Sequence, residues 1–216
     1  MFDIAGRQKL KPHEIEEFSF SIIDSEVPEP RPYAGSEWLV VRRMIHTTAD
    51  FELLDLVRFH PDAIDRGTEA IRRGCLVITD TEMARVGIGN KRLSKWGCKV
   101  ECHISDEAVA ARARKLGITR AAAAVDLVSD RINGSIYVIG NAPTSLMRLL
   151  DLIEQGKSSP ALVVGMPVGF VNAAESKERL IEQDKVPYIT IKGRKGGSAI
   201  AASVINALAG LADNQD

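Results

Sequence analysis

The sequence predicts an α/β protein of one domain, with a mostly parallel sheet, helices on both faces and a helical N-terminal segment. From residue 75 onward, short apolar runs alternate with longer stretches of helical periodicity. The runs are apolar throughout, as in Ala161-Leu-Val-Val164, which is typical of strands buried on both faces of a sheet. Because strands that alternate with helices imply right-handed crossovers, we expect a doubly wound, Rossmann-like arrangement.

The alternation places the α/β core at residues 75–211. We expect its strands at residues 75–79, 99–104, 135–139, 161–164 and 187–191. We expect its helices at residues 107–116, 120–131, 144–154, 173–183 and 198–211. Pro143 falls where a first helical turn would begin, and Asn172-Ala-Ala-Glu175 has the spacing of a capping box, so both agree with these boundaries.

Residues 1–74 differ from the core, because they show helical patterns without a clear strand. An apolar stripe predicts a helix over residues 13–24, and three prolines at positions 28, 30 and 32 then interrupt the chain. Residues 36–47 are apolar on most sides, which is typical of a helix buried in the protein or in a subunit interface. We find no internal repeat and therefore treat residues 1–216 as one domain.

The composition argues against several classes of function. The net charge is −1 over 216 residues, which gives no long-range attraction for nucleic acid or for an anionic membrane. No apolar run approaches the ~20 residues of a transmembrane helix, and the N-terminus lacks the apolar core of a signal peptide. The odd, small number of cysteines suits a reducing compartment. We therefore expect a cytoplasmic protein that binds neither nucleic acid nor membrane.

The cysteines also raise the question of a metal site. Cys98 and Cys102 share one face of a predicted strand, but His103 points to the opposite face. No second pair of ligands lies at the spacing of a zinc site. We expect structural thiols and no metal.

The helix at residues 36–47 carries a candidate site. Arg43 and His46 are three residues apart and therefore face the same way. The structural interpretation, which is the commoner one for an arbitrary helix, is that Arg43 pairs with a carboxylate and His46 bonds to a carbonyl. The functional interpretation is an arginine that holds an anion beside a histidine that exchanges a proton near neutral pH.

Three glycine-containing loops follow predicted strands, at residues 139–144, 165–171 and 193–198. In a parallel sheet such loops share one edge, where ligands bind, and we call this edge the rim. Backbone N–H groups and helix N-termini there favour anions, and Arg194 and Lys195 add positive charge. We predict that the rim binds carboxylates or phosphates, although each loop taken singly is equally explained as a tight turn with a helix cap.

Recognised catalytic and nucleotide signatures are absent from the sequence. Neither G-x-G-x-x-G after a strand nor G-x-x-x-x-G-K-[ST] occurs, which counts against the rival hypothesis of a nucleotide-binding regulatory domain. No serine lies in G-x-S-x-G. Asp80 ends the first core strand and is either a proton acceptor or, more commonly in such a position, the N-cap of the next helix.

Seven segments occur in an order and at a spacing that resemble one known family, the precorrin-8X methylmutases (cobalt-precorrin-8 methylmutases in the anaerobic pathway). The segments are Phe18-Ser-Phe-Ser-Ile-Ile23, Arg43-Met-Ile-His46, Thr119-Arg-Ala-Ala-Ala123, Ile139-Gly-Asn-Ala-Pro-Thr144, Gly165-Met-Pro-Val-Gly-Phe-Val171, Ala174-Glu-Ser-Lys177 and Gly193-Arg194 with Gly196-Gly-Ser198. Lys195, within the last of them, occupies a position that varies in the family. The resemblance spans roughly residues 15–210.

The resemblance implies an isomerase of cobalamin biosynthesis that moves a methyl group from C-11 to C-12 of a corrinoid tetrapyrrole, giving hydrogenobyrinate or cobyrinate. Such a sigmatropic shift needs neither a redox cofactor nor a methyl donor, so no cofactor is expected. The resemblance further implies that His46 handles the proton, that Ser19 and Arg43 contact the substrate, and that the protein is a homodimer with active sites near the subunit boundary.

The substrate carries acetate and propionate arms, for which cations and helix N-termini are suitable contacts. From chemistry and loop position we add contacts at Arg120, Asn141, Thr144, Arg194 and Lys195. The alternative function is a corrinoid-binding carrier that holds the product without turnover.

Overall fold

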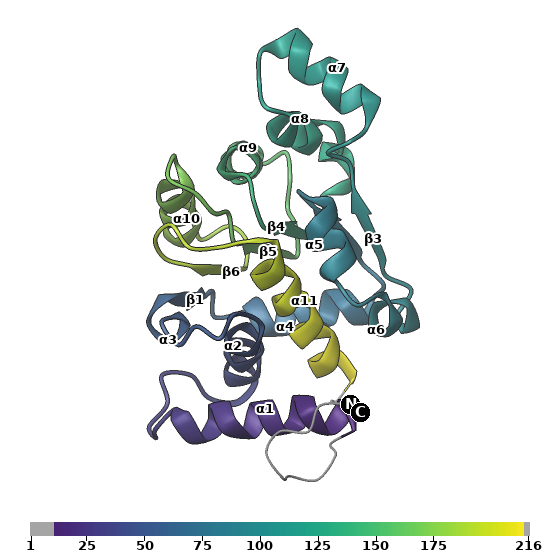
Figure 1. Ribbon diagram of the computed structural model, residues 1–216. Helices are drawn as coiled ribbons and strands as arrows, with labels where there is room; N and C mark the ends of the chain where they lie inside the picture. Colours follow the sequence, from purple (N-terminus) through teal and green to yellow (C-terminus); the bar gives the residue numbers. More distant parts are fainter. Residues whose placement is uncertain (1–10, 214–216) are drawn as a thin grey trace.

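The computed structural model describes residues 11–213, in which a six-stranded sheet lies between two layers of helices (Figure 1). Its strands are β1 (Val57–Phe59), β2 (Leu76–Thr79), β3 (Lys99–Cys102), β4 (Ile136–Ile139), β5 (Leu162–Gly165) and β6 (Tyr188–Ile191). Their order is β1-β6-β5-β4-β2-β3, with β1 antiparallel to β6 and the other pairs parallel. The five predicted core strands and the mostly parallel, doubly wound sheet are confirmed.

Helices cover both faces of the sheet. One face carries α2 (Gly35–Thr48), α4 (Ala63–Arg72) and α11 (Ser198–Asp213), and the other carries α8 (Arg120–Leu127), α9 (Pro143–Glu154) and α10 (Ala173–Glu182). α1 (Pro12–Glu26) packs on α2, and α7 (Glu107–Leu116) packs on α8. The short elements are α3 (Leu53–Leu56), α5 (Glu82–Gly87), α6 (Asn90–Lys95) and the 3-10 turn η1 (Ser129–Arg131).

The strand side chains alternate between the two layers, as burial on both faces requires. In β4, Ile136 and Val138 enter the cluster under α11, while Tyr137 and Ile139 enter the cluster under α9. All four residues are buried. The continuous apolar run in the sequence therefore reflects two separate cores on either side of one sheet.

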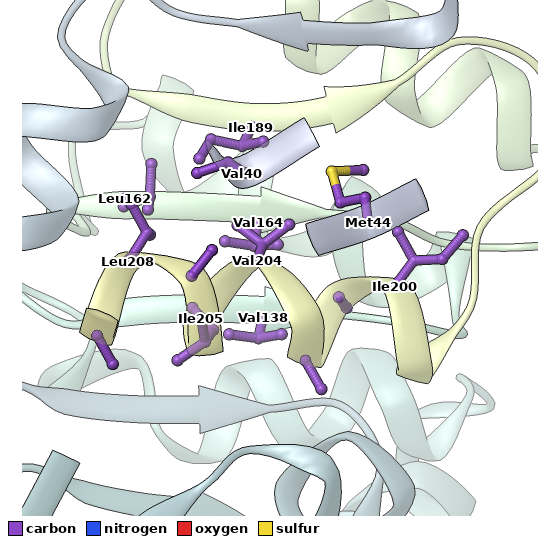
Figure 2. Close-up of a cluster of buried hydrophobic side chains, with 14 of the residues drawn as sticks. Val40, Met44, Val138, Leu162, Val164, Ile189, Ile200, Val204, Ile205 and Leu208 are labelled. Carbon is purple, nitrogen blue, oxygen red and sulfur yellow. The ribbon is translucent and has the colours of Figure 1, made fainter. Parts of the chain in front are cut away.

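α11 lies against the middle of the sheet and is buried along most of its length. Figure 2 shows its side chains against the strands, with Val204 beside Val164, while α2 lies alongside with Val40 at Ile189 and Met44 towards Ile200. The predicted burial of the helix over residues 36–47 is confirmed.

Two predictions of local structure are wrong. The N-terminal segment is not purely helical, because β1 pairs with β6 at residues 57–59 and the pairing is extended by His60 N–H to the Tyr188 carbonyl (2.9 Å). Three residues are too few for alternation to show in a sequence. Since β1 and α4 belong to the sheet and its covering layer, residue 74 is not a structural boundary. Residues 1–10 of that prediction lie outside the described residues.

The helix starts were predicted more successfully than their caps. α9 begins at Pro143 and α10 begins directly after Asn172, as expected. However, the Asn172 side chain makes no capping hydrogen bond, and its φ of 61° is left-handed. The predicted helix over 120–131 ends at Leu127 and is continued by η1.

Candidate active site

Phe20 of α1 joins the candidate side chains of α2. The ring lies 4.8 Å from the Arg43 guanidinium and 4.5 Å from that of Arg42, and its centroid is 5.0 Å from that of the His46 ring. The prediction that Arg43 and His46 face the same way is therefore confirmed. Ser19 precedes Phe20 and donates its hydroxyl to a carbonyl of its own helix (2.7 Å). Arg43 and His46 thus lie where α1 meets α2, and Ser19 lies on α1 next to the Phe20 that contacts them both.

The partners of Arg43 and His46 differ in kind. Arg43 forms an ion pair with Glu16 of α1, as the structural interpretation expects. The half-buried His46 ring, by contrast, forms no hydrogen bond with any of residues 11–213. The structural interpretation therefore explains Arg43 but leaves the His46 nitrogens available for chemistry.

The three glycine-containing loops meet at one edge of the sheet, as predicted. Backbone hydrogen bonds of 2.7–3.3 Å join the 165–171 loop to the other two. A Cβ at Gly196 would lie 2.4 Å from the carbonyl oxygens of Met166 and Pro167, so only glycine permits this approach. The rim is therefore one connected structure.

Asp80 occupies the point of the rim where the strand order reverses, between the carboxyl ends of β2 and β4. Its carboxylate accepts hydrogen bonds from the N–H groups of Gly140 (2.8 Å), Asn141 (3.0 Å) and Ala142 (2.8 Å). Burial raises the pKa of Asp80, and these three donors partly offset the rise. The Asn141 N–H is thus bonded within the rim. The cap of α5 is Thr81 and not Asp80, so the commoner expectation for Asp80 is wrong.

A second part of the rim joins the start of α8, which carries Arg120, to the start of α9, which carries Thr144. The Thr144 hydroxyl lies 2.8 Å from the hydroxyl of Thr119, which caps α8 and immediately precedes Arg120. Arg120 and Asn141 are exposed, and Arg120 makes no ion pair with residues 11–213. A cation and polar side chains therefore face solvent here.

The 193–197 loop uses its two cations differently. The Arg194 guanidinium lies 5.6 Å from the ring of Phe170, which is 83% exposed. The Lys195 ammonium instead lies 2.6 Å from both Asp50 and Glu52, just beyond the end of α2. These carboxylates raise the pKa of Lys195, whose charge is therefore paired within the protein, while its predicted substrate contact stays a prediction.

Lys177 of α10 was not predicted as a site residue, although it closes one of the family-like segments. Its side chain is fully buried, and its ammonium donates a hydrogen bond to the Lys195 carbonyl (2.5 Å). No carboxylate among residues 11–213 pairs with it. Burial alone lowers the pKa of Lys177 to about 8.

We expect Lys177→Met to raise the free energy of unfolding at pH 7 by about 1–2 kcal/mol, because it removes an uncompensated buried charge. The folded pKa lies below the unfolded value of about 10.4, so the charge destabilises the wild type fully below pH 8. The gain from the substitution therefore shrinks as the pH rises from 8 to about 10. Urea unfolding of the variant and the wild type at pH 7 and pH 10 measures this difference. A variant that is less stable than the wild type at pH 7 contradicts the expectation.

A cavity of about 280 Å³ lies between α1, α2, α6 and α11. Arg43, Phe20 and Glu16 line one side of it, but neither His46 nor the rim loops do. The cavity is therefore separate from the proton-handling candidate, although both use α2.

The thiols, the metal ligands and the membrane-spanning helices can also be examined in residues 11–213. The cysteines are free thiols, with Cys98 buried and Cys75 and Cys102 half-buried. No three His, Cys, Asp or Glu side chains in this part of the chain are grouped to hold a metal ion. None of the helices described is both long enough and apolar enough to cross a membrane.

Comparison with known proteins assigns the chain to a family. The family model for precorrin-8X methylmutase matches residues 14–211. The chain belongs to the precorrin-8X methylmutase family. Two methylmutase relatives, both named cobalt-precorrin-8 methylmutase, are similar over nearly their whole length. That of Leptospira interrogans is 46% identical over 90% of this chain and 91% of its own. That of Priestia megaterium is 44% identical over 95% of this chain and 90% of its own.

A solved methylmutase structure supports the same assignment. The precorrin-8X methylmutase from Thermus thermophilus matches with a TM-score of 0.86 and 44% identity, covering 93% of this chain and 96% of that chain. The family match over residues 14–211 includes both the α1–α2 cluster and the rim.

Proposed function

We propose that this protein catalyses the methylmutase reaction of cobalamin biosynthesis, moving a methyl group from C-11 to C-12 of precorrin-8X or cobalt-precorrin-8. The observation that carries the proposal is the family match across residues 14–211, which includes every candidate residue. The methyl group stays within one molecule, so the reaction consumes no methyl donor and transfers no net electrons.

His46 is the proposed proton donor and acceptor. A protonated ring nitrogen in the macrocycle draws electron density from the conjugated system and favours migration, and histidine exchanges protons near neutral pH. The Phe20 contact restricts the imidazole without consuming either nitrogen (5.0 Å between centroids). The enzyme's main contribution is then to hold the ring and place this proton.

Cations and hydroxyls hold the carboxylate arms in this proposal. Arg43 exchanges its partner Glu16 for a substrate carboxylate, with Ser19 beside it. On the rim, exposed Arg120 and Arg194 supply charge, and polar side chains at Asn141 and Thr144 donate hydrogen bonds.

We further propose a homodimer that completes the site. Ile15, Phe18 and Ile22 are 53%, 45% and 41% exposed along one face of α1. The cavity beside Arg43, about 280 Å³, is also smaller than the 300–1,000 Å³ typical of ligand pockets, whereas a corrinoid is a large ligand. Both facts fit a second subunit over α1. Sedimentation velocity distinguishes a dimer from a monomer of 23.5 kDa.

The cytoplasm is the proposed location, because a biosynthetic enzyme with free thiols fits a reducing compartment. Fractionation of cells followed by immunodetection tests this.

Turnover is tested by incubating the protein with precorrin-8X, or its cobalt form, and following the visible spectrum. An enzyme converts the chromophore catalytically. A carrier binds it at saturation and leaves the spectrum unchanged, which would overturn the proposal. The same assay with both substrates decides whether cobalt is required.

We expect Arg43→Ala to raise KM about 10-fold to 100-fold with a smaller change in kcat, because one charge-assisted contact is worth roughly 1.5–3 kcal/mol. Arg42→Ala is the matched control, since Arg42 also pairs with α1 (Asp24, 2.6 Å) and lies over the same ring. Equal KM changes in both variants would mean that the effect comes from loosening α1 and not from a substrate contact.

A further inference from the structure

We propose that Lys177 is a positioning residue for the methylmutase reaction, because its hydrogen bond to the Lys195 carbonyl fixes the loop that holds the end of the His46-bearing helix. The inference rests on the role proposed for His46. Lys177 itself is enclosed by protein and does not touch the substrate.

The first observation is that Lys195 is held from two sides. Its carbonyl accepts the Lys177 ammonium at 2.5 Å, and its own ammonium lies 2.6 Å from Asp50 and from Glu52. These carboxylates lie directly after α2, whose last turn contains His46. Lys195 therefore connects α10 with the end of α2, the helix that carries His46.

The second observation is that this connection is tightly packed. The neighbouring Gly196 passes so close to the 165–171 loop that a Cβ there would meet two carbonyl oxygens at 2.4 Å. The following Gly197 N–H donates to the Met166 carbonyl (2.9 Å). A loop held at these points transmits a displacement of the Lys195 backbone to its side chain and so to α2.

The third observation is that Lys177 is poorly suited to a purely structural role. Within the described part of the chain, this buried ammonium has one carbonyl acceptor and no carboxylate partner, which destabilises a fold. An apolar side chain of similar length fills the same space without that penalty. Residues that lower stability in this way are characteristic of functional regions. The 193–197 loop is the group that Lys177 contacts, so positioning of that loop is the function that the geometry supports.

The test compares Lys177→Met with Lys177→Arg and with Lys185→Met in the full chain. Lys185 is the matched control because its ammonium also donates to a backbone carbonyl (Glu154, 3.0 Å), but on the exposed surface at the far end of β6. We expect Lys177→Met to fold with an unchanged or higher Tm and to lose about 10-fold to 100-fold in kcat, since small misplacements of catalytic groups have such effects. We expect KM to stay within about threefold, Lys177→Arg to recover part of kcat, and Lys185→Met to match the wild type.

A double-mutant cycle that combines Lys177→Met with Lys195→Met tests whether Lys177 affects kcat through Lys195. If Lys177 acts through Lys195, the double variant loses no more kcat than the more affected single variant. Unchanged kcat in a folded Lys177→Met protein overturns the proposal. A double variant whose fold-loss in kcat equals the product of the losses of the two single variants also overturns it. A fully active His46→Ala protein would instead refute the proton role of His46, and the two failures are thus distinguishable.

Discussion

Replacing His46 with alanine is expected to lower kcat about 10²-fold to 10⁴-fold, the loss typical of a missing general acid–base. Binding of the corrinoid persists, because the carboxylate arms are held by other residues. The fold also persists, since the half-buried His46 ring has no hydrogen bond to lose within residues 11–213 and contacts the Phe20 ring. Substrate titration measures the binding, and single-turnover spectra measure the methyl shift.

Two further measurements make this expectation specific to the imidazole. Free imidazole in the buffer is expected to restore part of the activity of His46→Ala, because the substitution leaves space beside Phe20. His60→Ala is the control, since this histidine packs on Tyr188 at the opposite end of the sheet (5.8 Å between centroids) and is expected to leave kcat unchanged. Full activity of His46→Ala without imidazole would remove this residue from the mechanism.

Replacing Asp80 with alanine is expected to lower the free energy of unfolding by about 3–5 kcal/mol, because three N–H groups lose their acceptor in a largely dry site. The Asp80 side chain is 4% exposed and joins the end of β2 to the turn before α9. Since this turn also contacts the 165–171 loop, the rim loosens and KM rises. Urea unfolding gives the change in stability, and steady-state kinetics gives the change in KM.

Asp80→Asn separates the loss of the acceptor from the loss of shape. The amide keeps one oxygen, so we expect a smaller loss than for alanine. Asp130→Ala removes an exposed carboxylate from η1 and is expected to change stability by less than about 0.5 kcal/mol. A similar stability for Asp80→Ala and the wild type would show that water replaces the carboxylate at these N–H groups.

Much of the architecture could be predicted because it depends on local patterns. Apolar runs such as the one in β4 placed all five core strands to within two residues of each end. The meeting of the three loops followed from topology, because parallel strands end at the same edge. The shared orientation of Arg43 and His46 followed from helical periodicity alone.

Other features depend on residues that are far apart in the chain. The ion pairs of Lys195 could not be predicted, because its partners Asp50 and Glu52 lie 145 and 143 residues earlier in the chain. Asp80 was predicted to cap the helix that follows it, but its carboxylate crosses to the turn after β4. Neither partner can be recognised before the fold brings the segments together.

The position of α11 has a consequence for synthesis of the protein. This helix is the last of the described chain, yet it covers the centre of one face of the sheet and packs on α2 near the beginning (Figure 2). During translation, the apolar sides of β4 and β5 that face α11 therefore remain without this cover until residues 198–213 have left the ribosome. Contacts that join such distant segments form slowly, and the waiting chain is exposed to aggregation. The nascent protein is thus expected to depend on chaperones most strongly just before its final helix emerges.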